Sequence, residues 1–322
     1  MLPVKFRPVP MERIWGGHKL KSTFGVTHEA PIGEYWVVSG HPNGMSVVCE
    51  GPLEGKTLNE LTAAYPEAYL GTSHQSRFPL LIKFLEAEAD LSVQIHPDDD
   101  YAQQYEGDFG KTEAWYILDA IEGGKVNYGH TFASREEYEK AVQNGAVKDY
   151  LRYRDIQKGD LVFVPARTLH ALLAGTIVLE IQQTSDVTYR VYDWDRTDAN
   201  GKPRQLHVDK AAQVLQYGAE DPVVSPVQLQ EDEHVQHSRL VECQYFTIES
   251  LRARKAVSLS MGREGNPDVV IVAEGQGTLR AKVDGDNVTM SLRPGDAVLI
   301  PADVAAYQID PNGDMTLVRT FY

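Results

Sequence analysis

Short runs of apolar, β-branched and aromatic residues recur along the chain, and most of them end at Gly, Pro or Asp. This pattern predicts β-strands, because such side chains pack well on a pleated surface and the terminating residues break strands. The runs before residue 200 are 35–40, 46–51, 78–85, 91–97, 113–120, 160–166, 177–183 and 187–195. Those after residue 239 are 240–253, 267–283, 296–301 and 315–322. The hydrophobic pattern therefore predicts a mainly β protein.

Helical signals interrupt the strands in the first part of the chain. Residues 134–153 begin with Ser134 and place Glu137 three positions later, which is the capping-box arrangement of a helix N-terminus. Three more helices are predicted over 59–71, 98–107 and 206–218. The sequence thus predicts helices inserted between strands rather than a helical domain.

The acidic segment 228–238 is predicted to be a solvated linker. We place a domain boundary there, which gives a first domain of residues 1–227 and a second domain of residues 228–322. All the predicted helices lie in the first domain. We therefore expect a β domain with helical insertions, followed by a domain built of strands.

A repeat links the two parts of the chain. Residues 158–172 and 294–309 align without a gap, and both contain Gly-Asp, an apolar strand and Pro-Ala at the same spacing. Gly-Asp predicts a turn and Pro predicts the end of the strand. Two copies predict two related β-barrels rather than a solenoid. His170 of the first copy corresponds to Ala306 of the second, so a metal bound through this histidine would belong to the first barrel alone.

Composition and charge narrow the class of protein. The chain has 322 residues, of which 42% are hydrophobic and 24% charged, so it can bury a sizeable core. No apolar run reaches 18 residues and charges interrupt the first segment, so neither a transmembrane helix nor a signal peptide is expected. Cys49 and Cys243 lie far apart, which favours a reducing cytoplasm. The net charge of −15 disfavours nucleic acid and anionic membranes as partners, and any phosphate site must be built locally from basic residues.

Four residues with metal-binding side chains stand out. Gln94 and His96 are two apart in a predicted strand and therefore share one face of it. Glu113 lies in another predicted strand, and His170 follows a strand that ends at Pro. Two histidines, a carboxylate and a neutral oxygen suit Zn²⁺, although Fe²⁺ and Mn²⁺ accept the same donors. Each residue taken alone also fits an ordinary hydrogen-bonded or solvent-facing role.

These residues lie in motifs that resemble known families. The turn, strand and histidine of residues 158–172 resemble the second conserved motif of the cupin superfamily. "VQIHP" (93–97) and "GKTEAW" (110–115) resemble elements of type I mannose-6-phosphate isomerases. Further motifs of that family follow in its order at 13–17, 33–42, 80–85 and 189–196. The resemblance implies two cupin-like antiparallel β-barrels of jelly-roll type, with helical insertions in the first.

The resemblance also implies the roles of individual residues. It implies one Zn²⁺ per chain with four metal ligands, a catalytic arginine and two substrate-binding lysines: Gln94, His96, Glu113, His170; Arg190; Lys83, Lys111. From the sequence alone other roles stay open. Gln94 could be only a neighbour of the ion, Lys83 could extend outward from an edge strand, and Lys111 could be a loop lysine. Arg190 could form an ion pair with Asp193 or Asp195.

The implied activity is reversible isomerisation of mannose 6-phosphate and fructose 6-phosphate through a cis-enediol or enediolate. Lys83 could carry the proton only if burial lowered its pKa toward neutrality, and a zinc-bound water is the other candidate. The small sugar phosphate is the expected partner of a cytoplasmic protein that is monomeric by default. A metal cupin of another reaction, such as an O₂-using dioxygenase, and a non-catalytic sugar-binding or regulatory cupin are the alternatives. Trp15, Glu34 and Trp36 also match family motifs, and we interpret them as packing residues.

Overall fold

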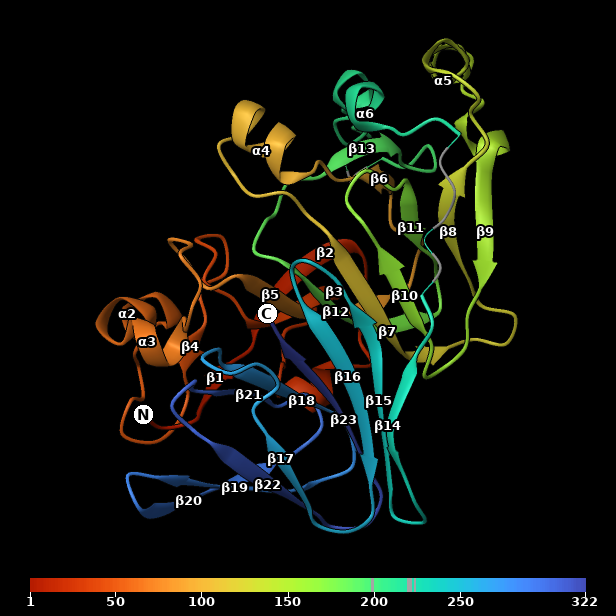
Figure 1. Ribbon diagram of the computed structural model, residues 1–322. Coiled ribbons are helices and arrows are strands. Elements are labelled where there is room, and N and C mark those ends of the chain that lie inside the picture. The colour runs from red at the N-terminus through yellow and green to blue at the C-terminus, as the bar shows by residue number, and fades with distance from the viewer. Residues whose placement is uncertain (198–199, 219–221, 223) are drawn as a thin grey trace.

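The computed structural model describes residues 1–197, 200–218, 222 and 224–322. Over these residues the strands form four antiparallel sheets of six, five, eight and four strands (Figure 1). The prediction of a mainly β protein is confirmed. Within the same residues, no helix is both long and apolar enough to cross a membrane.

The strands of the first two sheets come from residues 9–192. The six-stranded sheet has the order β10-β7-β12-β5-β3-β2, with β2 (Val9–Gly17), β3 (Ile32–Val38), β5 (Leu80–Ala87), β7 (Glu113–Ala120), β10 (Leu161–Val164) and β12 (Thr176–Gln183). The five-stranded sheet has the order β13-β6-β11-β8-β9, with β6 (Val93–Ile95), β8 (Lys125–His130), β9 (Leu151–Asp155), β11 (His170–Leu172) and β13 (Tyr189–Tyr192).

The other two sheets contain the C-terminal strands. The eight-stranded sheet has the order β14-β15-β16-β23-β18-β21-β1-β4, with β1 (Val4–Arg7), β4 (Val47–Val48), β14 (Val227–Glu231), β15 (Val235–Glu242), β16 (Thr247–Ala253), β18 (Asp268–Glu274), β21 (Ala297–Ile300) and β23 (Met315–Phe321). The four-stranded sheet has the order β17-β22-β19-β20, with β17 (Val257–Ser260), β19 (Gly277–Val283), β20 (Asp286–Leu292) and β22 (Ala306–Pro311). Strands β1 and β4 thus join a sheet whose other strands begin at residue 227.

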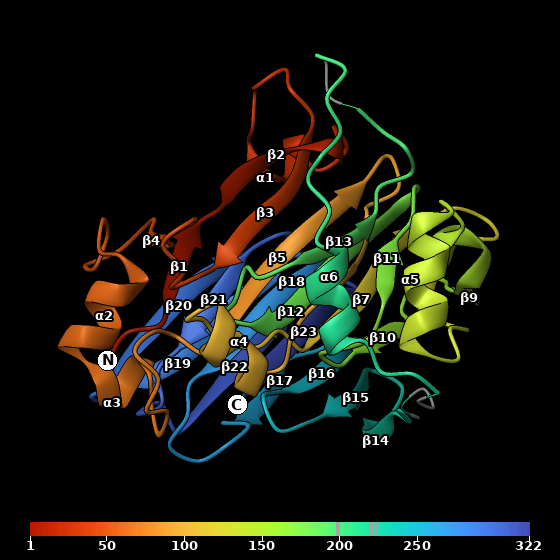
Figure 2. The ribbon, with the colours of Figure 1, turned by 90° about the horizontal axis from the view of Figure 1, so that it is seen from above.

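Helices fill the connections between the strands. They are α1 (Lys21–Phe24), α2 (Leu58–Ala64), α3 (Pro66–Tyr69), α4 (Asp99–Tyr105), α5 (Arg135–Gln143), the 3₁₀ helix η1 (Val147–Tyr150) and α6 (Val208–Val214). α5 and α6 cover the outer face of the five-stranded sheet, as Figure 2 shows from above. α2 and α3 pack at the side of the molecule, between the six- and eight-stranded sheets.

Four buried clusters show how the layers stack. One apolar core lies between the five- and six-stranded sheets, and another lies between the eight- and four-stranded sheets. A third joins the outer faces of the six- and eight-stranded sheets, and the fourth lies beneath α5 and α6. The molecule is therefore two β-sandwiches packed back to back, with helices over the outer layer of the first.

The sequence-based expectation of closed barrels is not confirmed. Among the described residues each sheet is open, and its first and last strands are edges. The apolar faces are buried by stacking one sheet on another, which removes the same surface from water without closing a sheet on itself. The division at residue 228 stays a prediction. Because β1 and β4 belong to the eight-stranded sheet, N-terminal strands also contribute to the second sandwich.

Two local predictions are wrong. The expected linker 228–238 forms most of the hairpin of β14 and β15, in which β14 is exposed along its whole length. An edge strand exposed on both faces lacks the apolar alternation by which strands are recognised. The helix expected over 134–153 ends at Gln143, because Gly145 adopts the left-handed conformation (φ 65°) that terminates helices.

The repeat found in the sequence extends over most of the strand order. The six-stranded order β10-β7-β12-β5-β3-β2 is matched by β21-β18-β23-β16-β15-β14 in the eight-stranded sheet. The order β6-β11-β8-β9 is likewise matched by β17-β22-β19-β20 in the four-stranded sheet. The two sandwiches therefore share one topology over these strands, and positions on them have counterparts, whereas β13 of the first sandwich and β1 and β4 of the second have none.

Candidate active site

The five-stranded sheet presents a row of polar side chains to the six-stranded sheet. Arg190 of β13 pairs with Gln94 of β6, and Gln94 pairs in turn with His170 of β11. Paired residues of antiparallel strands point to the same face, so these three side chains form one row across three strands. Val93 and Ile95 of β6 point the other way, into the core beneath α5 and α6. The predicted division of this strand into an apolar and a polar face is confirmed.

Charged side chains of the six-stranded sheet face this row. Glu113 is the first residue of β7, and Glu180 of β12 pairs with Lys83 of β5. Lys111 lies two residues before Glu113. Its ammonium group lies on the same side of the sheet and forms an ion pair with Glu113, with 3.1 Å between Lys111 Nζ and Glu113 Oε2. All four side chains are buried. The structure thus brings the residues singled out in the sequence between the two sheets of the first sandwich.

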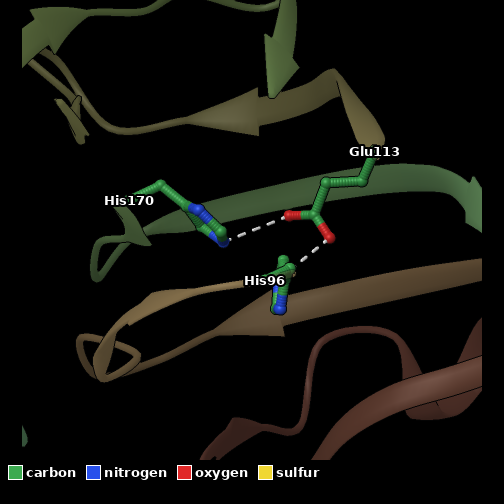
Figure 3. A group of neighbouring side chains, drawn as sticks. All are labelled: His96, Glu113 and His170. Carbon is green, nitrogen blue, oxygen red and sulfur yellow. Dashed lines mark ion pairs between the residues drawn. The ribbon is translucent and has the colours of Figure 1, made fainter. Parts of the chain in front are cut away.

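His96, Glu113 and His170 form a compact cluster with their side chains turned toward one another (Figure 3). His96 Nε2 lies 3.4 Å from Glu113 Oε2, and His170 Nε2 lies 3.3 Å from Glu113 Oε1. The three ligand atoms are all within 4.8 Å of one another. The three side chains are at least 99% buried.

Backbone carbonyls orient both imidazole rings. His96 Nδ1 lies 2.9 Å from the carbonyl oxygen of Val187, and His170 Nδ1 lies 2.8 Å from that of Thr168. A carbonyl can only accept, so each Nδ1 carries the proton and each Nε2 exposes a lone pair to the cluster. This arrangement is typical of metal-binding histidines, whose second nitrogen donates to a fixed acceptor.

The donor atoms of the cluster fit a metal ion. His96 Nε2 is buried and makes no hydrogen bond among the described residues, and a buried polar atom without a partner is costly. Two ligand atoms that each lie about 2.1 Å from one tetrahedral ion are about 3.4 Å apart, which is close to the two His–Glu separations. Two neutral imidazoles and one carboxylate are a donor set that zinc sites use.

The local electrostatics keep these ligands in their metal-binding protonation states. Burial, aided by the Lys111 ammonium, lowers the pKa of His96 to about 3. Burial also lowers the pKa of His170. Burial alone would raise the pKa of Glu113, but Lys111 and the two histidines outweigh it and hold that pKa well below its ordinary value. At neutral pH the cluster therefore offers two lone pairs and one negative charge.

Gln94 lies at the edge of the cluster. Its Nε2 is 3.5 Å from His170 Nε2, and its Oε1 accepts a hydrogen bond of 3.3 Å from Ser92 Oγ. A half-turn of the amide would place Oε1 beside His170 instead, with the oxygen then facing the cluster. The structure therefore puts Gln94 within reach of a metal held by the cluster.

A cavity of about 430 Å³ opens beside the cluster. Its lining is rich in charged and hydrogen-bonding side chains from both sheets: Arg13, Glu34, Lys83, Ser92, Gln94, Lys111, Glu180, Asp186, Thr188, Arg190 and Arg204. Trp15, Trp115 and three leucines supply the apolar part of the wall. Five cationic side chains in one cavity make a local positive site on a chain of net charge −15.

Opposite charges alternate along one side of this cavity. Lys111 Nζ lies 4.0 Å from Glu180 Oε1, and Lys83 Nζ lies 3.4 Å from the same oxygen. Lys83 Nζ is also 3.5 Å from Glu34 Oε2, and Arg13 Nε donates to Glu34 Oε1 at 2.8 Å. Each charge thus has an opposite partner, which is what permits so many charges to be buried together.

The two carboxylates of this series differ in their proton affinity. Burial would raise the pKa of Glu34, but Lys83 and Arg13 overcome it and lower the pKa to about 2. Burial and the neighbouring Glu113 charge raise the pKa of Glu180 to about 7, because together they outweigh the opposing effect of the Lys83 and Lys111 ammonium groups. The negative charges of Glu34 and Glu180 stabilise the ammonium form of Lys83, so the pKa of Lys83 is raised despite its burial. The condition under which Lys83 could act as a base is therefore not met.

Arg190 is held at the opposite wall of the cavity. Its Nη1 donates to the carbonyl of Gln205 at 2.8 Å, and its Nε donates to Ser92 Oγ at 3.3 Å. Within the described residues no ion pair joins it to Asp193 or Asp195. Arg204 Nε and Nη2 occupy the Asp193 carboxylate instead, at 2.8 and 2.5 Å.

Several cavity residues are not predicted by the sequence analysis, and Glu34 and Glu180 are the most consequential of them. Glu34 was expected to pack among the N-terminal strands, but its carboxylate is a partner of Lys83 and lies in the cavity wall. Glu180 sits inside an apolar run, 177–183, and was not singled out. The signal that could have found it is the charged residue itself, since a carboxylate in a buried strand needs a partner. Lys83 in another apolar run was such a partner.

The second sandwich keeps the position of the cluster but replaces its chemistry. Ile300 pairs with Asp268 as Val164 pairs with Glu113, so Asp268 is the counterpart of Glu113. The counterparts of Gln94, His96 and His170 are Ser260, Gly262 and Ala306, as the pairing of β17 with β22 sets them. Arg319 donates to Asp268 through Nε at 2.8 Å. A guanidinium thus neutralises the remaining carboxylate, and over the described residues no metal-binding group of three forms there.

Comparisons with known proteins agree with these features. Residues 4–122 match the family described as phosphomannose isomerase type I, catalytic domain. The chain is 44% identical over 248 residues to a probable mannose-6-phosphate isomerase, GmuF, of Bacillus subtilis, covering 76% of this chain and 78% of that protein. It is 38% identical to the mannose-6-phosphate isomerase of Streptococcus mutans, over 96% of this chain and 95% of that one. Its fold is similar to a crystal structure of the Bacillus subtilis mannose 6-phosphate isomerase, with a TM-score of 0.91 and 37% identity over 99% of both chains.

Proposed function

The chain belongs to the type I mannose-6-phosphate isomerase family, and we propose that it interconverts mannose 6-phosphate and fructose 6-phosphate with one Zn²⁺ at the His96–Glu113–His170 cluster. The observation that carries the proposal is a metal-binding cluster beside a cavity with five cationic side chains. Family membership makes the protein an aldose–ketose isomerase, so neither an oxygenase nor a non-catalytic sugar-binding role is carried forward.

His96, Glu113 and His170 would hold the ion, with Gln94 as a fourth ligand. The bound Zn²⁺ supplies Lewis-acid stabilisation of negative charge on the C1 and C2 oxygens of the sugar. Trp115 Nε1 donates to Glu113 Oε1 at 3.1 Å and fixes the orientation of this carboxylate. Lys111, whose ammonium lies in the cavity wall beside Glu113, would donate to the same sugar oxygens.

Arg190 at the opposite wall suits the phosphate group, whereas Arg204 beside it adds positive charge but is already paired with Asp193. Arg190 and Arg204 both line the cavity, and Ser92 Oγ lies beside Arg190. A guanidinium binds a phosphate through two parallel hydrogen bonds and stays charged at every working pH. With the phosphate held there, the other end of an extended hexose would reach toward the cluster. Because its strand neighbour is Gln94, Arg190 also lies near the cluster, and its guanidinium would stabilise the negative charge of the enediolate as well.

Isomerisation needs a group that removes a proton from C2 and returns one to C1. We assign this step to Glu180, a buried carboxylate in the cavity wall whose Oε1 makes no hydrogen bond among the described residues. Burial and Glu113 raise its pKa toward the range in which a carboxylate can both take and give a proton. Lys83 and Lys111 lie on either side of it and would stabilise the enediolate electrostatically.

Isomerisation in D₂O tests both the reaction and the proton route. Mannose 6-phosphate is expected to convert to fructose 6-phosphate that carries deuterium at C1, measured by NMR. The label enters because a proton held on a carboxylate exchanges with solvent between removal and return. Absence of conversion would refute the proposed reaction. Conversion with no deuterium in either sugar would keep the reaction and contradict a proton carrier that exchanges with solvent during turnover.

The Glu180→Gln variant tests the assignment of the proton carrier. An amide keeps the size of the side chain but cannot accept the proton, so kcat should fall by about 100-fold or more. Because protonation disables the carboxylate and its pKa is raised, the wild-type rate should also decline as pH falls, starting above the ordinary carboxylate range.

A matched control is Glu249→Gln, which changes a buried carboxylate in the second sandwich. We expect it to lower the melting temperature and to leave kcat near the wild-type value. Wild-type kcat in Glu180→Gln would remove Glu180 from the proton route and leave a water in the cavity as the carrier.

A further inference from the structure

A short segment links the two sheets that enclose the candidate active site. Residues 184–188 cross from the end of β12 in the six-stranded sheet to the start of β13 in the five-stranded sheet, and we call them the crossover segment. Asp186 and Thr188 of this segment line the cavity. The carbonyl of Val187 is the acceptor that orients His96. One short stretch of backbone thus shapes both the metal cluster and the cavity.

The crossover segment is polar, and its first two residues are enclosed, whereas residues 186–188 are partly exposed. Thr184 and Ser185 have no solvent exposure. At its first residue, Thr184 N donates to the carbonyl of Pro79 at 2.9 Å, and Arg77 Nη2 donates to the Thr184 carbonyl at 2.8 Å. These contacts fix where the segment begins. They do not reach the part that carries Val187.

Gln182 holds that later part from inside the sandwich. Its Nε2 donates to the carbonyls of Gln183 and Ser185, both at 2.7 Å. The side chain has no solvent exposure, and its Oε1 has no hydrogen-bond partner in the described residues. Ser185 Oγ in turn accepts from Val187 N at 3.3 Å. A chain of contacts therefore runs from Gln182 through Ser185 and Val187 to His96.

Geometry explains why one amide can do this. Gln182 pairs with Glu113 across β12 and β7, so its side chain starts on the face that carries the cluster. From there its two N–H groups satisfy two buried carbonyls that turn the backbone toward β13. Without a donor these carbonyls would be buried and unpaired, and the segment would have to shift to satisfy them.

We infer that Gln182 is a positioning residue, which sets His96 for metal binding and Asp186 and Thr188 for substrate binding through the crossover segment. This inference rests on the proposed function, since it concerns the metal and substrate of the same site. Gln182 touches neither group itself. Its effect travels through backbone position, which distinguishes it from the ligands and from Glu180.

The Gln182→Met variant tests the inference. Methionine keeps the length and volume of the side chain and removes both donated hydrogen bonds. The dissociation constant for Zn²⁺, measured by competition with a chromophoric chelator, is expected to rise by about 10- to 100-fold, as it does when the outer partner of a metal ligand is lost. KM for mannose 6-phosphate should rise as well, by more than kcat falls in the fully metal-loaded enzyme.

Asn127→Leu is a closely matched control. Asn127 is also fully buried, its Nδ2 also donates to two backbone carbonyls, and its Oδ1 also lacks a hydrogen-bond partner among the described residues. It lies on β8, away from the crossover segment. We expect a comparable loss of melting temperature in the metal-free protein, with the Zn²⁺ affinity and KM of the wild type. Equal affinities in the Asn127 and Gln182 variants would show that Gln182 is merely structural.

Ser185→Ala keeps the inference testable if Gln182→Met does not fold. It removes only the contact between Ser185 Oγ and Val187 N, and it should raise the Zn²⁺ dissociation constant in the same direction by a smaller factor. An unchanged dissociation constant in a folded Ser185→Ala would overturn the inference. Failure of the wild-type protein to bind Zn²⁺ would refute the proposed metal site instead, so the two failures are distinguishable.

Discussion

The His170→Ala variant is expected to lose its metal and, with it, isomerase activity. His170 is fully buried, and its Nε2 points at Glu113 Oε1 from 3.3 Å. Alanine would remove one of the two imidazole ligands and leave His96, Glu113 and the neutral amide of Gln94, a poor donor set for zinc. Metal content after dialysis, measured by elemental analysis, should fall from about one ion per chain to near zero. Turnover of mannose 6-phosphate should fall to background.

His237→Ala controls for the loss of a buried histidine as such. His237 lies in the second sandwich, where its Nε2 is 2.8 Å from Glu249 Oε2. The variant loses a buried His–Glu contact like that of His170, so its melting temperature should fall. Its metal content and turnover should stay at the wild-type level. Unchanged metal content in His170→Ala would exclude His170 as a ligand.

Arg190→Ala is expected to lower kcat by about 100- to 1,000-fold while the metal stays bound. Removing one preorganised donor to a developing negative charge has costs of this size. Arg190 is half-buried at the cavity wall, positioned by Ser92 Oγ and the Gln205 carbonyl. Its guanidinium makes no contact with the three clustered ligands in the described residues, so their geometry should survive.

Arg190→Lys separates charge from shape. Lysine keeps the positive charge but lacks the planar fork that binds a phosphate or an enediolate through two hydrogen bonds. We expect a kcat between those of the wild type and Arg190→Ala, with full metal content in all three proteins. Near-wild-type kcat in Arg190→Ala, measured at saturating mannose 6-phosphate, would remove Arg190 from the mechanism.

Local patterns in the sequence predict the parts of the fold that depend on short-range physics. The strand predicted over 113–120 is β7, Glu113–Ala120. Its apolar and aromatic side chains favour a strand because they pack well on a pleated surface. The helix expected to start at Ser134 does so, since the Ser134 side chain accepts from Glu137 N. Period two in β6 also places Gln94 on the face opposite to Val93.

The assembly of the site depends on long-range pairing, which no local pattern specifies. Glu34, Lys83 and Glu180 come from three strands far apart in the sequence and meet because β3, β5 and β12 are neighbours in one sheet. Their charges then decide one another's pKa. For this reason the proposed role of Glu180 and the raised pKa of Lys83 rest on contacts that the sequence does not predict.

The stacking of open sheets could not be predicted from the hydrophobic pattern either. The alternation of apolar and polar residues along a strand is the same whether its apolar face is buried inside a closed barrel or against another sheet. Motif resemblance, in contrast, predicts that His96, Glu113 and His170 lie together, and the structure places them in one cluster. Resemblance carries information on tertiary neighbours that the hydrophobic pattern lacks.

Metal removal and reloading tests the central claim most directly. The protein is stripped with a chelator, titrated with Zn²⁺, and assayed for conversion of mannose 6-phosphate to fructose 6-phosphate at each step. We predict no turnover without metal and a linear recovery that reaches its plateau at about one Zn²⁺ per chain. Full turnover in the stripped protein, or no turnover at any metal content, would contradict a zinc-dependent isomerase.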